Sequence, residues 1–326
     1  MGGPATVEEH VEVPGGRIWY RIAGADRPGT PVLCLHGGPG MPHDYLEPLE
    51  DLAVDRPVVF YDQLGCGRSD RPADDSLWTT GRFVEELAAV HAALGLERPH
   101  LFGNSWGGWL ALQYALDRRP ALASLVLSSS PPSVSRWIAD CAELRAMLDE
   151  PVRDVLDRHE AGGYFSCPEY QWAITQFYRR HVCRQDPWPA CVERTFAGMG
   201  ADVYLTMWGP SEFGPVTGRL RDWDVTGRLS EIQVPTLVTG GRHDEARPAH
   251  LAVLAEGIRG AELVIFENSS HMAFIEERRP YIQTVSDSPP GPKPVRLRDR
   301  TPETVPRSRM PRLTAHRCPA RRESAA

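Results

Sequence analysis

Six short apolar runs recur along the chain and constrain its fold more than any other feature. They cover residues 31–35, 57–61, 99–103, 124–128, 235–240 and 262–266. Runs of this length, apolar on both faces, are typical of buried parallel strands. Residues 80–94 and 106–117 instead place apolar side chains three to four positions apart, as amphipathic helices do. This alternation predicts an α/β fold with a mostly parallel, doubly wound sheet.

The domain organisation follows from where these runs stop and resume. Residues 9–22 alternate polar and apolar side chains around Gly15 and Gly16, which predicts a hairpin that opens the fold. After Pro131 the strand-like runs give way to helical, Trp-rich sequence, and they resume beyond Leu229. We expect a core in two parts with an inserted helical cap; a second, independent domain is the alternative. The expected limits are 1–130 and 230–286 for the core and 131–229 for the cap.

The C-terminal segment differs from the rest of the chain. A last helix is expected from about Glu276 to Val285. Beyond it, residues 287–326 contain eight prolines and few periodic apolar residues. A segment of this composition cannot bury enough apolar surface to fold, so we expect it to be disordered.

Composition and charge exclude several functional classes. The chain has 326 residues, 41% of them hydrophobic and 24% charged, which is ordinary for a globular protein. We expect a cytoplasmic protein without membrane contact, because no signal peptide and no apolar run of roughly 20 residues is evident. Its net charge of −7 argues against nucleic-acid binding. The seven cysteines show no zinc-ligand spacing, so we expect neither structural zinc nor a disulfide framework.

Residues 103–107 (GNSWG) match the pattern G-x-S-x-G between a predicted strand and a predicted helix. This context is that of a nucleophile elbow, in which a sharp turn exposes a serine at the top of the sheet. The flanking glycines are required because larger side chains would collide with neighbouring strands. The sequence therefore predicts an α/β-hydrolase fold with Ser105 as the catalytic nucleophile.

A serine nucleophile needs a general base, and the base needs an acid that orients it. Of the 11 histidines, His271 fits best, because it lies in the loop after the last predicted strand. Asp244 follows the preceding strand and is the expected acid, with Glu245 as its rival. The alternative for Asp244 is a role as a helix cap before Pro248.

The transition state of acyl transfer needs donors for a developing oxyanion. Residues 36–40 (HGGPG) follow the first buried strand and expose backbone amides there. We expect one donor from Gly37 or Gly38 and the other from Trp106, the residue after the nucleophile. A simple Gly/Pro turn is the alternative.

Five motifs together resemble the prolyl aminopeptidases, also called proline iminopeptidases. They are HGGPG (36–40), YDQLGCGRSD (61–70), GNSWGG (103–108), MWGPSEF (207–213) and GRHDE (241–245). The resemblance spans residues 9–286 and implies an α/β-hydrolase core with a helical cap and no metal or cofactor. It implies release of an N-terminal residue, preferably proline, from short peptides. It also implies that Glu212 and Glu245 bind the free amino terminus of the substrate.

Other functions remain possible at this point. The same triad serves amino-acid amidases and ester or lactone hydrolases, and fold alone does not separate them. A non-catalytic binding protein is a further alternative, although such a protein would be expected to lose part of the triad. The aromatic residues of the predicted cap form either a proline pocket or a hydrophobic core: Trp172, Phe177, Tyr178, Tyr204 and Trp208.

Overall fold

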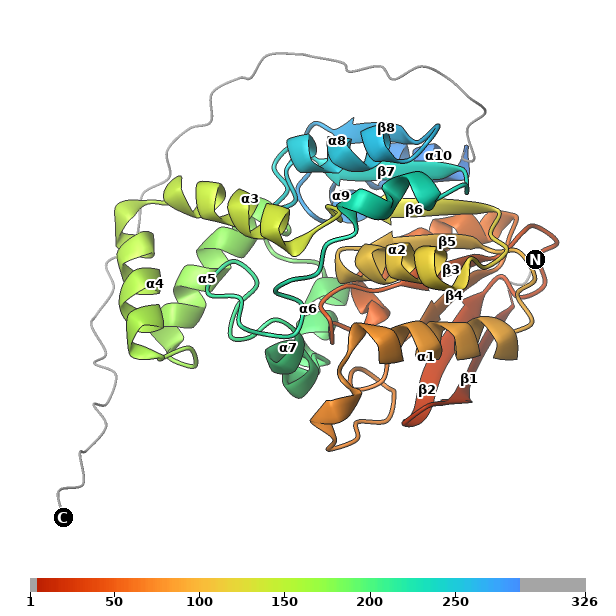
Figure 1. Ribbon diagram of the computed structural model, residues 1–326, viewed down its shortest axis with the longest axis horizontal. Coiled ribbons are helices and arrows are strands. Elements are labelled where there is room, and N and C mark those ends of the chain that lie inside the picture. The colour runs from red at the N-terminus through yellow and green to blue at the C-terminus, as the bar shows by residue number, and fades with distance from the viewer. Residues whose placement is uncertain (1–4, 288–326) are drawn as a thin grey trace.

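A computed structural model describes residues 5–287 of the protein, and most of the segment predicted to be disordered lies outside this range. Eight strands form one sheet in the order β1-β2-β4-β3-β5-β6-β7-β8 (Figure 1). β1 (Thr6–Val13) and β2 (Gly16–Ala23) form the predicted antiparallel hairpin. β2 pairs antiparallel with β4, and all further pairs are parallel.

The six predicted core strands are all present, each within one residue of its expected limits. They are β3 (Val32–Leu35), β4 (Val58–Tyr61), β5 (His100–Asn104), β6 (Ser124–Ser128), β7 (Thr236–Gly241) and β8 (Glu262–Phe266). The mostly parallel α/β sheet predicted from the sequence is therefore confirmed. Central strands are buried on both faces, which is why they read as continuous apolar runs.

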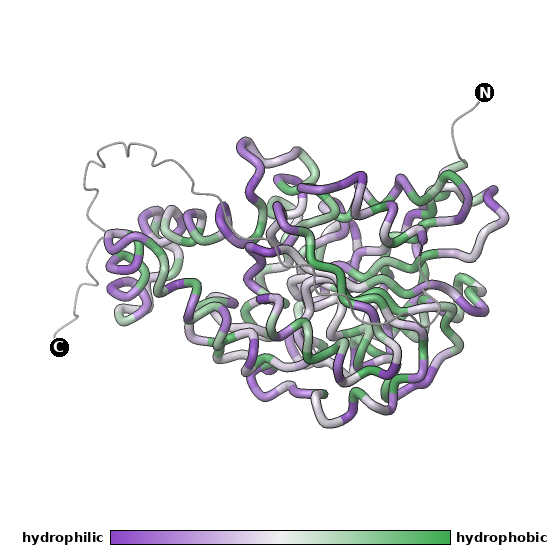
Figure 2. The backbone as a smooth tube through the Cα atoms, turned by 90° about the horizontal axis from the view of Figure 1, so that it is seen from above, coloured by the Kyte–Doolittle hydropathy of each residue, from purple (hydrophilic) through white to green (hydrophobic). Residues whose placement is uncertain are grey.

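Side chains of each central strand alternate between two hydrophobic cores. Leu33 and Leu35 belong to one core, whereas Val32 and Cys34 of the same strand belong to the other. This division follows from the two-residue period of a strand. In Figure 2, hydrophobic segments run through the middle of the core region and hydrophilic segments lie mostly around it.

Helices cover both faces of the sheet. The first core is closed by α1 (Thr80–Ala93), α2 (Trp106–Arg118) and α8 (Pro248–Gly257). The second core is closed by the 3-10 helix η1 (His43–Val54), α9 (Ala273–Glu276) and α10 (Arg278–Ser286). A further short 3-10 turn, η2 (Asp75–Leu77), precedes α1. Because helices cover both faces of the sheet, the strand ends and their connecting loops lie at two opposite edges of the sheet.

Five helices interrupt the sheet between β6 and β7 and lie beyond one end of it (Figure 1). They are α3 (Val134–Ala146), α4 (Glu150–Gly162), α5 (Pro168–His181), α6 (Ala190–Ala197) and α7 (Ala201–Met207), and the 3-10 helix η3 (Thr226–Glu231) follows them. The segments that lead from the core into these helices and back lie side by side, because Ser133 forms an isolated antiparallel β-bridge with Asp224. β7 then pairs directly with β6. We propose that the cap has the predicted limits, 131–229.

None of the helices in residues 5–287 is long and apolar enough to cross a membrane.

Candidate active site

Ser105 lies at a sharp turn between β5 and α2. Its backbone has a φ of 56° and a ψ of −126°, a strained conformation for a residue with a side chain. The turn brings backbone segments so close that a Cβ atom at Gly103 would lie 2.3 Å from the carbonyl oxygen of Gly107. A Cβ atom at Gly107 would lie 2.2 Å from the carbonyl oxygen of Leu35 in β3. These contacts explain why the pattern requires glycine on both sides of the serine.

His271 lies in the loop between β8 and α9, opposite a buried carboxylate. Its Nδ1 donates a hydrogen bond of 2.8 Å to Oδ1 of Asp244, which also accepts one of 2.9 Å from the backbone amide of Ala246. Oε1 of Glu245 lies farther from the same nitrogen, at 3.8 Å. Because Nδ1 carries the proton, Nε2 of His271 is left as the basic nitrogen.

The predicted site residues gather around one cavity of about 620 Å³. Six of them line it: Gly37, Gly38, Ser105, Glu212, Glu245 and His271. Asp244 is buried behind His271, and Trp106 is buried at the start of α2. Among the described residues, no hydrogen bond joins the hydroxyl of Ser105 to His271, and such bonds commonly shorten only when substrate is present.

The loop after β3 is held by Tyr45, a residue that the sequence did not single out. The backbone amide of Gly37 donates a hydrogen bond of 2.7 Å to the hydroxyl of Tyr45. That hydroxyl donates one of 2.8 Å to Oδ1 of Asn104, the neighbour of the nucleophile. The amide of Gly37 is therefore engaged, whereas the amides of Gly38 and Trp106 donate to no other described residue.

His36 supports the same loop from inside the core. The amide of Gln63 donates to its Nε2 at 2.8 Å, so Nδ1 carries the proton and donates to the carbonyl of Gly37 at 3.0 Å. Burial lowers the pKa of His36 to about 4, which keeps its ring neutral. Oε1 of Gln63 accepts a hydrogen bond from the indole of Trp106 at 2.8 Å. Residues of HGGPG and YDQLGCGRSD thus form one network beneath the nucleophile.

The cap also contacts the loop after β3. The indole nitrogen of Trp208, a buried residue just after α7, donates a hydrogen bond of 2.6 Å to the carbonyl of Gly38. The amide of Gly200 donates to the carbonyl of Gly40 at 2.8 Å. Trp208 fixes the backbone at Gly38, whose own amide faces no protein acceptor. The cap therefore helps to orient the loop nearest the serine.

Two acidic side chains share the cavity with Ser105. Glu245 is buried, and its Oε2 has no hydrogen-bond partner in the part of the chain that the structure describes. Glu212 is partly buried, and its backbone amide donates a hydrogen bond of 3.1 Å to the hydroxyl of Tyr204. The unpartnered, buried Oε2 of Glu245 lowers the free energy of unfolding unless a ligand supplies a hydrogen-bond donor.

The electrostatics of this pair follow from burial and from like charge. Burial raises the pKa of Glu245 well above its ordinary value, and the negative charges of Glu212 and Asp244 raise it further. Burial raises the pKa of Glu212 as well, although the hydroxyl of Tyr178 and the positive charge that His271 can carry oppose this. A cationic group between the two carboxylates would stabilise both in the ionised state.

The cap aromatics serve both of the roles considered from the sequence. Tyr178 and Tyr204 line the cavity, and Trp208 contacts the loop after β3. Phe177 stacks on Phe213 at 4.2 Å between ring centroids, and Trp172 packs against the larger core. Of these five residues, Tyr178 and Tyr204 therefore belong to the wall of the site, and the other three do not.

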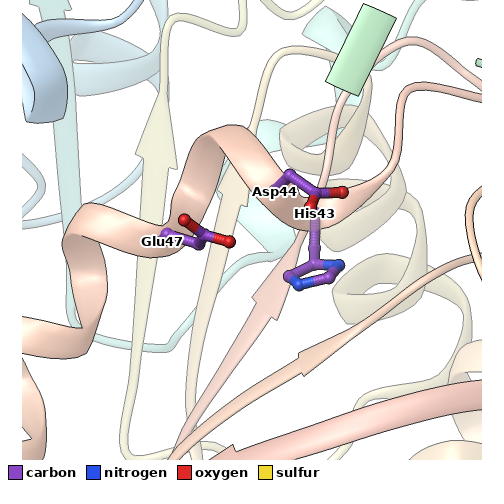
Figure 3. Close-up of side chains that lie close together, drawn as sticks. All are labelled: His43, Asp44 and Glu47. Atoms are coloured by element: carbon purple, nitrogen blue, oxygen red, sulfur yellow. The ribbon is translucent and has the colours of Figure 1, made fainter. Parts of the chain in front are cut away.

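A separate cluster of His43, Asp44 and Glu47 on η1 brings together groups that can ligate metals (Figure 3). Nδ1 of His43 is bound to Asp62 at 2.7 Å. Asp44 and Glu47 both pair with Arg194 of α6. Because the carboxylates are neutralised by an arginine, we assign this cluster to cap attachment and not to a metal.

Comparison with known proteins first defines the class. The family model of the alpha/beta hydrolase fold matches residues 30–159, in agreement with the sheet and the serine turn. The curated proline iminopeptidase of Heyndrickxia coagulans is 40% identical over 281 residues, 86% of this chain and 97% of that protein. The proline iminopeptidase of Saccharolobus solfataricus is 41% identical over 271 residues, 82% of this chain and 86% of the relative. The chain belongs to the proline iminopeptidase family.

Solved structures agree with this assignment. The crystal structure of the Mycobacterium smegmatis proline iminopeptidase has a TM-score of 0.79 and 38% identity, and the match covers 86% of this chain and 96% of that one. The crystal structure of VinJ has a TM-score of 0.83 and 41% identity, with coverage of 86% and 97%.

The contact of Gly107 with β3 leads to a first prediction. Gly107→Ala should destabilise the fold by at least about 2 kcal/mol, because the new methyl group would meet the backbone of Leu35 and not a movable side chain. Gly81→Ala is the matched control, since nothing lies within 4 Å of its new methyl group in helix α1. Urea unfolding should show Gly81→Ala neutral or slightly stabilised. Equal stability of both variants would contradict the steric account.

The contact of Trp208 with Gly38 leads to a second prediction. Trp208→Phe keeps an aromatic ring but removes the indole donor, and should lower kcat roughly tenfold while KM changes much less. Trp223→Phe is the control, because its indole donates to Gln113 and does not line the cavity. Steady-state kinetics on a prolyl arylamide would measure both. A similar fall in kcat for the two variants would show that only packing is affected.

Proposed function

We propose that this protein is a serine aminopeptidase that releases an N-terminal residue, preferably proline, from peptides through an acyl-enzyme. Membership of the proline iminopeptidase family supports this activity. The observation that carries it is the unpartnered carboxylate oxygen of Glu245 in the cavity that Ser105 also lines. A peptidase that accepts only a free amino terminus needs such an anion close to its nucleophile.

In this proposal Ser105 is the nucleophile and His271 the general base. Nε2 of His271 removes the hydroxyl proton as Oγ attacks the scissile carbonyl, and Asp244 stabilises the imidazolium that forms. His271 then delivers the proton to the departing amine, and the peptide C–N bond breaks. A water molecule, activated by the same histidine, hydrolyses the acyl-enzyme. Free proline and the original serine are the products.

We assign the oxyanion donors to the amides of Gly38 and Trp106. Both amides lack an acceptor among the described residues, whereas the amide of Gly37 donates to Tyr45. Trp106 is the first residue of α2, and the first amides of a helix carry a partial positive charge. This charge would also stabilise the oxyanion. Loss of one such donor typically costs about 10²–10³ in rate. Gly37 then acts as support for the loop.

Glu212 and Glu245 are proposed to hold the α-ammonium group of the substrate. A cation between them would relieve their mutual repulsion and supply the donor that Oε2 of Glu245 lacks. A fixed amine also holds the scissile carbonyl near Ser105, which lowers the entropic cost of reaction. This pair favours an aminopeptidase or amino-acid amidase over an enzyme that takes neutral esters or lactones.

The catalytic assignment is tested by substitution of the nucleophile and the base. Ser105→Ala and His271→Ala should each lower kcat on a prolyl arylamide by about 10⁴ or more, and the double variant should be little worse, because the residues act as a unit. The wild type should be labelled by a fluorophosphonate and Ser105→Ala should not. Near-normal turnover in Ser105→Ala would exclude this mechanism.

The role of the acidic pair is tested with Glu245→Gln, which removes a charge and nearly preserves shape. We expect kcat/KM for a prolyl arylamide to fall about thirtyfold, or ~2 kcal/mol, and kcat/KM for a small neutral ester to change much less. N-acetylation of the substrate should reproduce the loss in the wild type. An unchanged preference for amine over ester in both Glu245→Gln and Glu212→Gln would refute amine binding.

Stability provides the control for this variant. Burial raises the pKa of Glu245 in the folded chain above its value in the unfolded chain, so the folded protein binds more protons. Its stability therefore falls as pH rises from the ordinary glutamate range through the raised pKa. Glu245→Gln lacks this loss, so its Tm should exceed that of the wild type by a margin that grows with pH. A less active but more stable variant cannot be explained by misfolding.

A further inference from the structure

The cavity extends well beyond the catalytic residues. One wall follows α5 from Tyr178 to Gln171. These residues are seven positions apart on the helix, or about 10 Å at 1.5 Å per residue. With a volume of about 620 Å³, the cavity lies in the range that encloses ligands of drug size. A prolyl residue at the acidic pair fills only a minor part of it.

The remaining space belongs to the group that leaves. A substrate with its amine at Glu212 and Glu245 and its carbonyl at Ser105 has a small ring as its side chain. Whatever fills the rest of the cavity is therefore attached through the scissile nitrogen. The outer lining is mainly apolar and comes from the cap: Phe165, Ile174, Phe196, Met199 and Leu205.

The charge of the lining is one-sided. Its only titratable groups apart from tyrosines are Glu212, Glu245 and His271, and no Lys or Arg occurs among the described residues that line the cavity. Arg71 reaches the α6–α7 connection from outside, where it donates to the carbonyls of Gly198 and Met199. The cavity thus offers an ammonium group two carboxylates and offers a carboxylate no cation.

This lining bears directly on the second residue of a peptide. In a free dipeptide, the terminal carboxylate follows the scissile nitrogen within one residue, about 3.8 Å per Cα step, and so lies inside the cavity. It would lose water against apolar side chains and would be repelled by the acidic pair. A neutral amide at the same position has neither cost.

We propose that the cap side of the cavity is a subsite for a neutral, apolar leaving group. The substrates it selects are prolyl amides of apolar amines and peptides whose carboxylate is blocked or several residues away, rather than free prolyl dipeptides. This inference rests on the proposed function. In the reaction the prolyl C–N bond breaks, the apolar amine leaves with the proton from His271, and water releases proline from Ser105.

The test compares two substrates that differ in one group, Pro-Phe-NH₂ and Pro-Phe. At pH 7.5 the wild type should release proline from the amide with a kcat/KM at least about tenfold higher than from the dipeptide. Pro-Gly-Gly-Phe, whose carboxylate lies farther from the scissile bond, should regain part of the lost rate. Equal kcat/KM for Pro-Phe-NH₂ and Pro-Phe would overturn the subsite and leave the aminopeptidase assignment intact.

A variant with an added cation sharpens the test. Leu205 lines the cavity and is 54% exposed, so a polar side chain is tolerated there. Leu205→Lys should lower the ratio of amide to dipeptide kcat/KM at least about threefold, whereas Leu205→Gln, of similar length but neutral, should not. If both variants change the ratio equally, charge is not what excludes the dipeptide, and the subsite is wrong. If the wild type releases proline from neither substrate, the proposed function itself fails.

Discussion

The close approach of three backbone segments around Ser105 is the constraint on which the site depends. β5, the start of α2 and the end of β3 meet so tightly that Gly103 and Gly107 leave no room for a Cβ atom. The strained backbone of Ser105, worth about 1–3 kcal/mol, persists because these segments are buried and hydrogen-bonded. The same approach brings the loop after β3 beside the first amides of α2. The proposed nucleophile and the proposed oxyanion donors are thus placed by one steric contact.

The cap is part of the catalytic scaffold and not only a cover. The amides of His271 and Met272 donate to the carbonyls of His181 and Val182, at 3.1 and 3.2 Å, just where α5 ends. Trp208 holds the loop of Gly38 from the other side. Both loops that complete the site are therefore fixed by cap backbone or cap side chains. A displacement of the cap would disturb the proposed general base, His271, and the proposed oxyanion loop together.

The fold was predictable because its signals are local. Short apolar runs and the glycines around Ser105 report burial and steric limits within a few residues. The contacts of Tyr45, Gln63 and Trp208 could not be predicted in this way, because their partners lie elsewhere in the chain or in another element: Gly37, His36 and Gly38. Asp244 and Glu245 are adjacent in sequence, and only tertiary geometry shows which contacts His271. The one-sided charge of the cavity likewise arises from residues scattered over the cap.

The acidic pair of Glu212 and Glu245 lowers the folding stability of the protein and, in the proposed function, makes the site selective for substrates with a free amine. An arginine beside Glu245 would neutralise its charge, as Arg82 does for the buried Glu86 of α1, although one oxygen of that carboxylate also has no hydrogen-bond partner among the described residues. No arginine or lysine among residues 5–287 pairs with Glu245, and its Oε2 has no hydrogen-bond partner there. The two carboxylates destabilise the fold while the cavity is empty. In the proposed function, the ammonium group of a bound substrate stabilises them by supplying positive charge and hydrogen-bond donors. No lysine or arginine among the described lining residues compensates the two negative charges. Their electrostatic field therefore extends along the apolar cavity and repels a second anion there. Attraction of the substrate's amino terminus and repulsion of a nearby carboxylate therefore have one cause: no cationic side chain of the described lining neutralises the acidic pair.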